Sequence, residues 1–560
     1  MNHRIGIACS ALARGVAQIG SSAAKVVGLF RAPPDGAVPY AWFLRDEVAR
    51  YDSALGTDGP GRIDDQTWCD LELGRYLDML SAESSIFGRQ ALYRRLRAGM
   101  AAPMSASAVA MAVQQPPPPL DGAMPTPENM MQPLRGVDCE VGGLLFQDEL
   151  PVAPSWVGRL WAVPLALIGS LLTIALGAWA VGGIALGATL IVSAWVQIAL
   201  HEPLHRWHRQ RNAIVTMLGV AHALARTADR CAHPLLGQIG TLQRASGRLL
   251  TLFGPRLVER VPALAEYANL LAVYQYRRYG EDLELLRQEL PTLRTLFRHV
   301  SDIEADLAIQ RHLATVAWSC WVTRGVDRQL DLVDVVNPLL DPAQPLSLRL
   351  DGKGAFITGQ NGVGKSTLLR TIGLNMVVAR AFGFCYARSA VMPTASVATS
   401  IQIEDSLETG QSLYMAELRR ARALLQQVQR SGDTVVIVDE IFRGTNHLES
   451  VASAASVLHE LAKRSLVLVS SHNLALAALL ANDLEAVCVA RVTRAGGSGL
   501  LIEPGVLAET NGLAMLSEFG FPQVTLANAK VVFDWYAGHM TNPGVCPRWV
   551  SPMAAPPPRH

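Results

Sequence analysis

The run Gly359-Gln360-Asn361-Gly362-Val363-Gly364-Lys365-Ser366-Thr367 constrains the fold of this chain more than any other segment. Apolar residues 355–358 precede the run and a helical pattern begins at Leu368, so the order is strand, glycine loop and helix. The spacing G-x-x-x-x-G-K-[ST] is that of a P-loop, whose glycines let the backbone direct several N–H groups at one phosphate. We expect Lys365 to reach the β- and γ-phosphates of ATP and the Ser366 hydroxyl to ligate Mg²⁺. The predicted phosphate loop consists of Gly359, Asn361, Gly362, Gly364, Lys365, Ser366 and Thr367.

Two later apolar runs end in polar residues suited to phosphate chemistry. Residues 434–438 form a β-branched run that ends in Asp439 and Glu440, the pattern of a Walker B strand. We expect Asp439 to hold Mg²⁺ and Glu440 to polarise the attacking water, with an ordinary strand and a solvated acidic turn as the alternative. Residues 466–469 form the next run, and His472 follows it. A histidine at the tip of a parallel strand can hydrogen-bond a γ-phosphate, while a lone histidine is more often structural.

Two segments around the predicted Walker B strand resemble one known family. Glu404-Asp405-Ser406-Leu407-Glu408-Thr409-Gly410-Gln411-Ser412-Leu413-Tyr414-Met415-Ala416-Glu417-Leu418 precedes that strand, and Ile441-Phe442-Arg443-Gly444-Thr445-Asn446 follows it. With the P-loop, they resemble the ATPase domain of the MutS family, whose motifs read GPNMGGKST, DDLxxGxSTFMxEM and DEIGRGTST. The resemblance covers roughly residues 335–535. Gln360 and Gly362 stand where the family has Pro and Met, and Leu413 and Tyr414 where it has Thr and Phe.

The resemblance implies a fold and a quaternary arrangement. The implied fold is an α/β P-loop ATPase domain of the ABC-like, MutS type, C-terminal to an all-α core and lever region. In the family the signature serine contacts the γ-phosphate bound by the partner subunit, so Ser412 implies a head-to-head homodimer with composite ATP sites. Residues 407–411 also resemble the LSGGQ segment of ABC transporters, but Arg443-Gly444-Thr445 is MutS-like.

Charge and cysteine content bound the surroundings of the protein. A net charge of +1 over 560 residues gives no global attraction to nucleic acid, so a DNA-binding surface would be a local patch. The 8 cysteines show no CxxC spacing, which indicates reduced thiols in a cytosolic protein. Arg4, Arg14 and Lys25 interrupt the apolar residues near the start, so we expect no cleaved signal peptide.

A long uncharged stretch predicts a membrane hairpin. No charged residue occurs from Leu160 to Leu200, a length that suits two helices, with the turn expected at Gly182-Gly183. The tryptophans in and beside it, Trp156, Trp161, Trp179 and Trp195, partly match an interfacial belt. Arginines flank both ends, Arg159 before and Arg206, Arg209 and Arg211 after, which predicts a cytoplasmic (inner) membrane protein with the ATPase domain in the cytosol. The alternative is a buried pair of helices in a soluble core.

The remaining segments complete the predicted domain organisation. Residues 61–100 resemble the MutS core, with Thr67-Trp68-Cys69-Asp70-Leu71-Glu72-Leu73 in place of its NLEL-type motif, and 301–308 resemble the lever helix. The residues that follow position 100 are rich in Pro and Met, a composition that predicts a linker. The predicted boundaries are an N-terminal region 1–60, a core-like segment 61–100, a linker 101–150, a hairpin 156–202, a helical core and lever 203–330, an ATPase domain 335–535 and a tail 536–560.

These features predict a membrane-tethered MutS-type ATPase that acts as a nucleotide-driven dimer switch, with DNA as the expected partner. Classical mismatch recognition uses a Phe-x-Glu wedge, and no Phe-x-Glu occurs in this sequence. Any DNA binding is therefore expected to be independent of sequence. Two alternatives remain open: a transporter-like or signalling membrane ATPase with no nucleic-acid role, and a nucleotide-binding scaffold that scarcely hydrolyses ATP.

Overall fold

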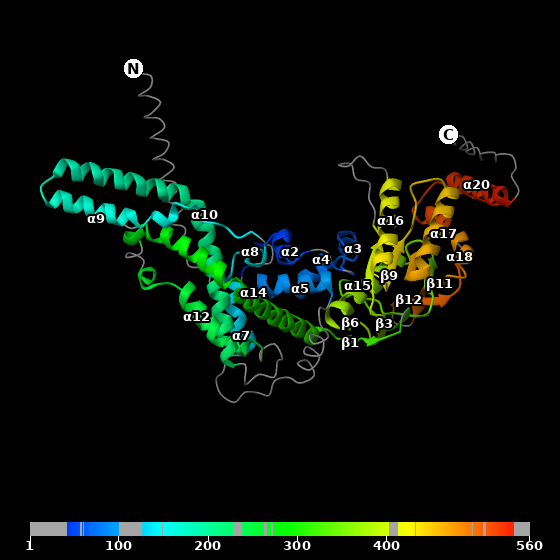
Figure 1. Cartoon of the computed structure of the whole chain (residues 1–560). Coiled ribbons are helices and arrows are strands. Elements are labelled where there is room, and N and C mark those ends of the chain that lie inside the picture. Colours follow the sequence, from blue (N-terminus) through cyan, green and yellow to red (C-terminus); the bar gives the residue numbers. More distant parts are fainter. Residues whose placement is uncertain are drawn as a thin grey trace, which may run out of the picture. The chain divides into compact units, whose positions relative to one another are not determined.

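The computed structural model describes residues 38, 42–56, 59, 61–99, 126–147, 149–227, 238–261, 266–269, 273–326, 328–402, 413–431, 433–494, 497–507 and 511–541. The chain divides into two compact units (Figure 1). The first, which we call the helical unit, comprises Met1–Thr57, Leu77–Arg94 and Met104–Thr315. The second, the sheet unit, comprises Asp58–Tyr76, Arg95–Pro103 and Val316–His560.

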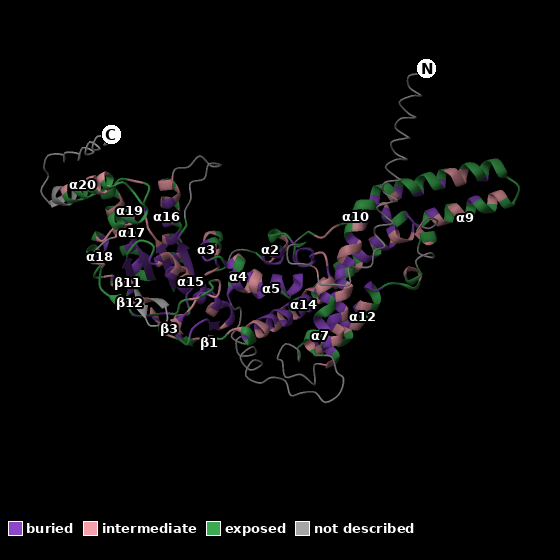
Figure 2. Cartoon of the chain, turned by 180° about the vertical axis from the view of Figure 1, so that it is seen from behind, coloured by how far each residue is buried: buried purple, intermediate pink, exposed green. Residues whose placement is uncertain are grey.

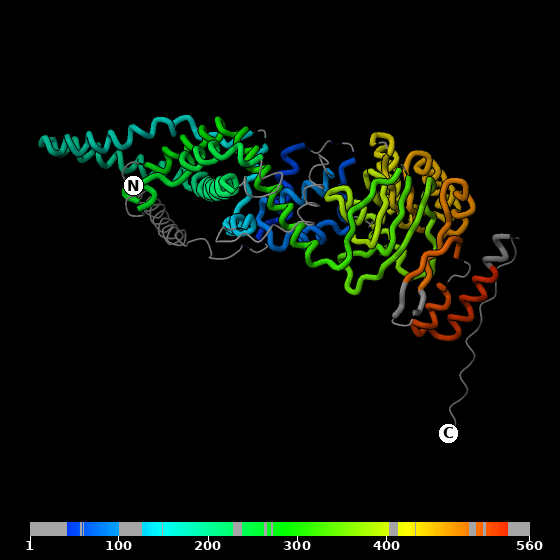
Figure 3. Tube along the Cα trace, turned by 90° about the horizontal axis from the view of Figure 1, so that it is seen from below, coloured from blue at the N-terminus to red at the C-terminus, as the bar shows by residue number. Residues whose placement is uncertain are grey.

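A six-stranded sheet with the order β12-β11-β5-β10-β9-β8 forms the centre of the sheet unit. Figure 3 shows the part of this unit after residue 316 in colours that run from green through yellow and orange to red. Its strands are β5 (Gly354–Gly359), β8 (Ser396–Ser400), β9 (Thr434–Asp439), β10 (Leu466–Ser470), β11 (Leu484–Arg494) and β12 (Gly497–Pro504). The pairs β8–β9, β9–β10, β10–β5 and β5–β11 are parallel, and only β12 runs antiparallel to its neighbour within the sheet as described. The strands predicted at 355–358, 434–438 and 466–469 are therefore confirmed as β5, β9 and β10.

Continuous apolar runs form these strands because helices cover the sheet and keep both faces of its central strands from water. The covering helices are α15 (Lys365–Phe382), α16 (Leu413–Ser431), α17 (His447–Arg464) and α18 (Ala475–Leu479). One buried cluster joins Phe356, Val436 and Val467 of the strands to Leu424 of α16 and Leu458 of α17. The α/β class that the P-loop predicts is confirmed for this unit.

Smaller elements complete the sheet unit. A second sheet has the order β2-β7-β3-β4, and β1 pairs with β6. These strands are β1 (Cys320–Trp321), β2 (Thr323–Arg324), β3 (Gln329–Val335), β4 (Leu346–Asp351), β6 (Phe384–Cys385) and β7 (Ser389–Met392), and α19 (Gly512–Glu518) and α20 (Gln523–Thr541) follow β12. The predicted helical region 203–330 is thus too long by its last residues, which form strands of this unit.

The predicted core-like segment 61–100 does not stay with one unit. Helix α3 (Asp65–Asp70) belongs to the sheet unit, where the buried Asp70 carboxylate accepts hydrogen bonds from Thr399 Oγ1 (2.6 Å) and Ile401 N (2.9 Å). The same carboxylate accepts from Gln402 N (3.0 Å). Residues far upstream of the predicted ATPase boundary at 335 therefore help to build this unit, because α3 supplies acceptors for backbone donors after β8.

The helical unit contains only helices in the part that the structure describes. They are α2 (Arg45–Ala54), α5 (Ile86–Ala98), α7 (Pro127–Met131), η2 (Gln132–Gly136), α8 (Gly142–Phe146), η3 (Val157–Arg159), α9 (Ala162–Ala175), α10 (Trp179–Thr227), α12 (Gln243–Phe253), η5 (Leu257–Arg260) and α14 (Tyr274–Thr315), with α4 (Leu73–Leu80) and α5 at its boundaries with the sheet unit. α10 runs without a break through the predicted boundary at 202/203.

The predicted linker 101–150 is wrong for its second half. Residues 126–147 form α7, η2 and α8, and the Phe146 ring packs 4.8 Å from Tyr51 and 5.6 Å from Phe297, measured between centroids. The Arg294 guanidinium also donates to Leu145 O (2.6 Å). These short apolar groups lack helical periodicity, so their burial depends on partners that are distant in sequence.

The predicted hairpin is present, but its turn is not at Gly182-Gly183. The chain turns at Gly177, which has φ +89°, and the amides of Gly177 and Ala178 donate to Ile174 O (3.0 Å) and Thr173 O (3.1 Å). These are the two hydrogen bonds of a Schellman motif, which ends α9. Gly182 lies instead in α10, where a Cβ would be 2.9 Å from Ile174 N. Its role is to let the two helices pack closely.

The hairpin is mostly exposed, as the green ribbon of α9 and the first half of α10 shows (Figure 2). Two helical segments, Val157–Ala175 and Trp179–Thr227, are long and apolar enough to cross a membrane by length and composition, and 22% of each apolar window is buried. Within this chain the hairpin is therefore not a buried core, the alternative weighed from the sequence. The Ser170, Thr173 and Thr189 hydroxyls donate to helical carbonyls four residues earlier, which satisfies them without water.

Candidate nucleotide-binding site

The predicted site residues follow three neighbouring parallel strands. β10 lies between β5 and β9, and its last residue, Ser470, is level with Ile357 of β5 and with Asp439 of β9. The loops after these strands therefore leave the sheet at the same edge, the place where open α/β sheets bind ligands. The order of the strands, with β10 in the middle, brings His472 between the P-loop and the Walker B residues.

The P-loop leads from β5 into α15 through left-handed backbone. Gly364, at the N-cap of α15, has φ +109°, a conformation that a residue with a Cβ rarely adopts. At Gly359 a Cβ would lie 2.7 Å from Val489 O of β11, so the loop can approach the neighbouring strand only with glycine. Within the described residues no side chain caps α15, which leaves its positively polarised N-terminus directed into the loop.

Lys365 lies inside this loop. Its side chain is buried, and Nζ donates to Gly359 O (2.9 Å) and Gln360 O (3.1 Å). Burial lowers the pKa of the Lys365 ammonium, and the neighbouring Asp439 and Glu440 carboxylates partly offset that effect. The structure thus brings the predicted P-loop lysine close to both predicted Walker B carboxylates.

Glu440 is held as a carboxylate by its neighbours. His472 Nε2 donates to Glu440 Oε1 (2.8 Å), and the Arg443 guanidinium lies 3.5 Å from Oε2. The hydrogen bond from His472 is the largest cause that holds the pKa of Glu440 below its usual range, against the opposite effect of burial. Asp439, one residue earlier, accepts a hydrogen bond from Ser470 Oγ. The contact that the structure shows for His472 is with Glu440, so its predicted contact with phosphate stays a prediction.

Comparison with known proteins identifies the sheet unit. The family model for MutS domain V matches residues 355–535. The DNA mismatch repair protein MutS of Thermus aquaticus is 31% identical over 269 residues, which cover 46% of this chain and 33% of that protein. The MutS proteins of Thermus thermophilus (28% identical, 50% and 35% covered) and Bacillus subtilis (26%, 36% and 24%) match similarly.

Residues 355–535 of this chain belong to the MutS family. The resemblance noted from its motifs is confirmed. The matches span about a third or less of the length of these curated relatives.

Two further residues of the matched domain add to the predicted site. The Asn511 side chain holds the P-loop, since its Oδ1 accepts from Asn361 N (2.9 Å) and its Nδ2 donates to Asn361 O (3.4 Å). Glu417, on α16, accepts hydrogen bonds from the backbone that follows Glu440. Both residues lie within residues 335–535, which resemble MutS, but their partners lie on other elements and gave no local signal. Ser412 lies outside the described residues, so its contact with a partner subunit stays a prediction.

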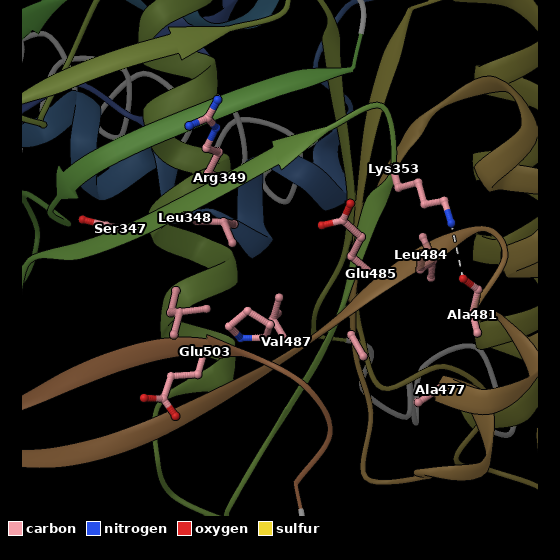
Figure 4. Close-up of a pocket in the computed structure, with 13 residues that line it drawn as sticks. Ser347, Leu348, Arg349, Lys353, Ala477, Ala481, Leu484, Glu485, Val487 and Glu503 are labelled. Atoms are coloured by element: carbon pink, nitrogen blue, oxygen red, sulfur yellow. Dashed lines mark hydrogen bonds between the residues drawn. The ribbon is translucent and has the colours of Figure 1, made fainter.

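A groove elsewhere in the sheet unit is separate from this site (Figure 4). Its volume is about 520 Å³, and its lining includes Lys353 at the amino end of β5, Leu484 and Val487 of β11, and Glu503 of β12. Lys353 and Leu484 lie level with the amino end of β5, whereas Val487 and Glu503 lie level with its last residues. None of the lining residues belongs to the predicted site. Lys353 Nζ is 3.5 Å from Ala481 O.

Proposed function

We propose that this MutS-family protein hydrolyses ATP and works as a nucleotide-driven dimer switch. The observation that carries this proposal is the convergence of Lys365, Asp439, Glu440 and His472 at one edge of a parallel sheet, with Glu440 kept ionised by His472. A carboxylate so placed can orient a water molecule and accept its proton. The family membership supports the same chemistry, because MutS domain V is matched across all of these residues.

The residues present suit ATP as substrate and Mg²⁺ as its cofactor. Gly362 has φ +72°, and no atom of the described chain lies within 4 Å of the place a Cβ would take, which leaves open space beside the loop. The backbone of the loop and Lys365 would hold the phosphates, and Ser366 and Asp439 would hold Mg²⁺. When bound, Mg²⁺ neutralises charge on the phosphate oxygens. Glu440 orients the attacking water, and His472 positions the Glu440 carboxylate.

Dimerisation and DNA binding are the expected consequences of this site. Ser412 would complete the site of a partner subunit, so ATP would hold two sheet units together and hydrolysis would release them. The matched relatives are named as DNA mismatch repair proteins, which supports DNA as the partner. Without a Phe-x-Glu segment, this chain would contact DNA chiefly through phosphates, independently of base sequence.

A membrane tether is part of the proposal. The α9–α10 hairpin exposes Leu172, Ile184 and Ile191, and its turn satisfies its own amides through the Schellman bonds at Gly177. Lipid offers no hydrogen-bond partners to the backbone, so these two hydrogen bonds reduce the cost of placing the turn near lipid. We place the hairpin in the cytoplasmic membrane, with the sheet unit in the cytosol, because arginines flank both of its ends.

The test is steady-state ATP hydrolysis by detergent-purified protein, titrated with matched, mismatched, branched and single-stranded DNA. Glu440→Gln should keep ATP binding and lose turnover by roughly two to four orders of magnitude, as loss of a positioned base does. Lys365→Ala should weaken nucleotide binding itself. Turnover by Glu440→Gln at the wild-type rate would exclude the role given to Glu440. If the protein hydrolyses ATP but binds none of these DNAs, and none of them changes the rate, a signalling or transporter-like ATPase would be favoured.

The DNA titration also tests specificity. Phosphate contacts are sensitive to salt and blind to sequence, so affinity should fall steeply with salt. It should differ less than about threefold between matched and mismatched duplexes, below the roughly 1 kcal/mol of a specific base contact. A tenfold preference for the mismatched duplex would mean that the chain reads mismatches by another surface.

A further inference from the structure

Glu417 is a buried carboxylate that the proposed chemistry does not use. It lies on α16 with 2% of its surface exposed. Its Oε1 accepts from Arg443 N (3.1 Å) and its Oε2 from Gly444 N (3.2 Å), while Arg443 Nε lies 3.6 Å from Oε1. A carboxylate that accepts two backbone amides binds a turn in one orientation. The turn that it binds is the one that directly follows Glu440.

That turn has an unusual backbone. Glu440 has φ +54° and Phe442 has φ +57°, left-handed values that non-glycine residues adopt only where their surroundings determine them. The Phe442 ring is buried against Tyr414 of α16, with centroids 6.1 Å apart. At Gly444 a Cβ would lie 2.7 Å from Tyr414 N. Hydrogen bonds, a ring contact and close packing therefore all fit the turn to the first two turns of α16.

Contacts that α16 makes with segments other than the turn after Glu440 fix the position of this helix. Arg420, one turn after Glu417, donates to Thr399 O (2.8 Å) and pairs with Asp64 (2.6 Å). α16 begins at Leu413, directly after Ser412 in the sequence. Any displacement of α16 consequently reaches the turn after Glu440 through Glu417.

We propose that Glu417 is a positioning residue for Glu440, which couples the position of α16 to the placement of the general base. This inference rests on the proposed function and names a regulator of the same site. Glu417 contacts neither water nor phosphate in this scheme; it holds the turn that sets the direction of the Glu440 carboxylate toward His472. We call the hydrogen bonds from the Arg443 and Gly444 amides to Glu417 the clamp. Loss of the clamp leaves the P-loop intact, so it should reduce turnover without weakening ATP binding.

The test uses Glu417→Gln, which keeps the size of the side chain but turns an amide group toward a backbone N–H. A misplacement of about 1 Å costs up to roughly a hundredfold in rate, so we expect kcat to fall about ten- to hundredfold with KM and ATP affinity within about twofold. Glu460→Gln, an exposed glutamate of α17, is the matched control and should behave as wild type.

A second variant acts on the same contact from the other side. Gly444→Ala forces the turn away from Tyr414 N, so it should reproduce the kcat defect, and the double variant should be no worse than the more impaired single variant. Independent, multiplying defects would overturn the coupling. So would a Glu417→Gln protein that keeps its kcat, or one whose ATP affinity falls as much as its turnover.

Hydrogen exchange separates this inference from the proposed function. In Glu417→Gln the amides of Arg443 and Gly444 should exchange faster than in wild type, while those of β5 and β10 should be unchanged, which also shows that the protein is folded. If the wild-type protein does not hydrolyse ATP, the proposed function fails, but the exchange rates of the Arg443 and Gly444 amides still test whether Glu417 holds the turn. Unchanged exchange at Arg443 and Gly444 overturns the inference.

Discussion

Replacement of Asp70 by alanine should destabilise the sheet unit strongly, although Asp70 lies hundreds of residues upstream of the P-loop. Asp70 is 1% exposed and accepts from Thr399 Oγ1, Ile401 N, Gln402 N and Gln66 Nε2 at 2.6 to 3.0 Å. Water can replace the carboxylate at the last two donors, which are less buried. The first two would stay buried without an acceptor, at about 1–3 kcal/mol each. The expected loss is therefore about 2–6 kcal/mol in the free energy of unfolding, a large part of the stability of an ordinary domain.

The assay is hydrogen exchange of detergent-solubilised protein across a urea series, which gives the free energy of opening for β5, β9 and β10. Asp65→Ala is the control, since Asp65 lies on the same helix, its side chain is 93% exposed, and its ion pair with Arg97 should contribute about 0–1 kcal/mol. Near the middle of the expected range, Asp70→Ala should also lower Tm by about 10 °C, because about 1 kcal/mol shifts a domain of this size by 2–4 °C. A difference between the two variants below about 1 kcal/mol would refute the argument that α3 belongs to this unit energetically.

Three further outcomes follow from the site and the hairpin. The pKa of Glu440 in the folded protein lies below its ordinary value, so the carboxylate stays ionised as pH falls through that ordinary value. His472→Ala removes the main cause and should shift the acidic limb of the kcat/KM profile to higher pH. An acidic limb that does not move would contradict the Glu440–His472 contact. Mixing Lys365→Ala with Ser412→Ala subunits should restore one complete composite site and raise ATPase activity above either variant alone, whereas inactive mixed dimers would count against a shared site. The protein should resist extraction from membranes by salt and carbonate, and deletion of residues 160–200 should yield soluble protein that still binds ATP; extraction of the wild type by salt alone would argue against the membrane hairpin.

The candidate nucleotide site was the most predictable part of the chain, because its signals are local. A glycine loop between a strand and a helix, and carboxylates at the end of a buried strand, each occupy a few consecutive residues, and the resemblance to MutS motifs joined them. The order of the strands was not visible in the same way. Nothing local states that β10 lies between β5 and β9, and that neighbour relation is what brings His472 onto Glu440.

The wrong positions predicted for the hairpin turn and the linker have one cause: the role of the residues concerned depends on contacts with distant parts of the chain. Gly182 looked like a turn and is a close contact between helices, while Gly177, with φ +89°, makes the turn. Glycine suits both roles for the same reason, the missing Cβ, so composition cannot distinguish them. Likewise the predicted linker contains Phe146, whose burial depends on Tyr51 and Phe297 and not on any neighbour in sequence.

The sequence by itself determined the family, the α/β class of the sheet unit, the identity of the predicted catalytic residues and the presence of an uncharged hairpin, since each depends on short-range spacing or on an unbroken run. Only the tertiary structure decided that α3 supports β8 through Asp70 and that Glu417 clamps the turn after Glu440. Both are hydrogen bonds from a buried carboxylate to donors on another element. In the sequence, a carboxylate within a helical pattern suggests a residue on the solvated face of the helix. Only the packing of the chain buries that carboxylate and brings its hydrogen-bond donors to it.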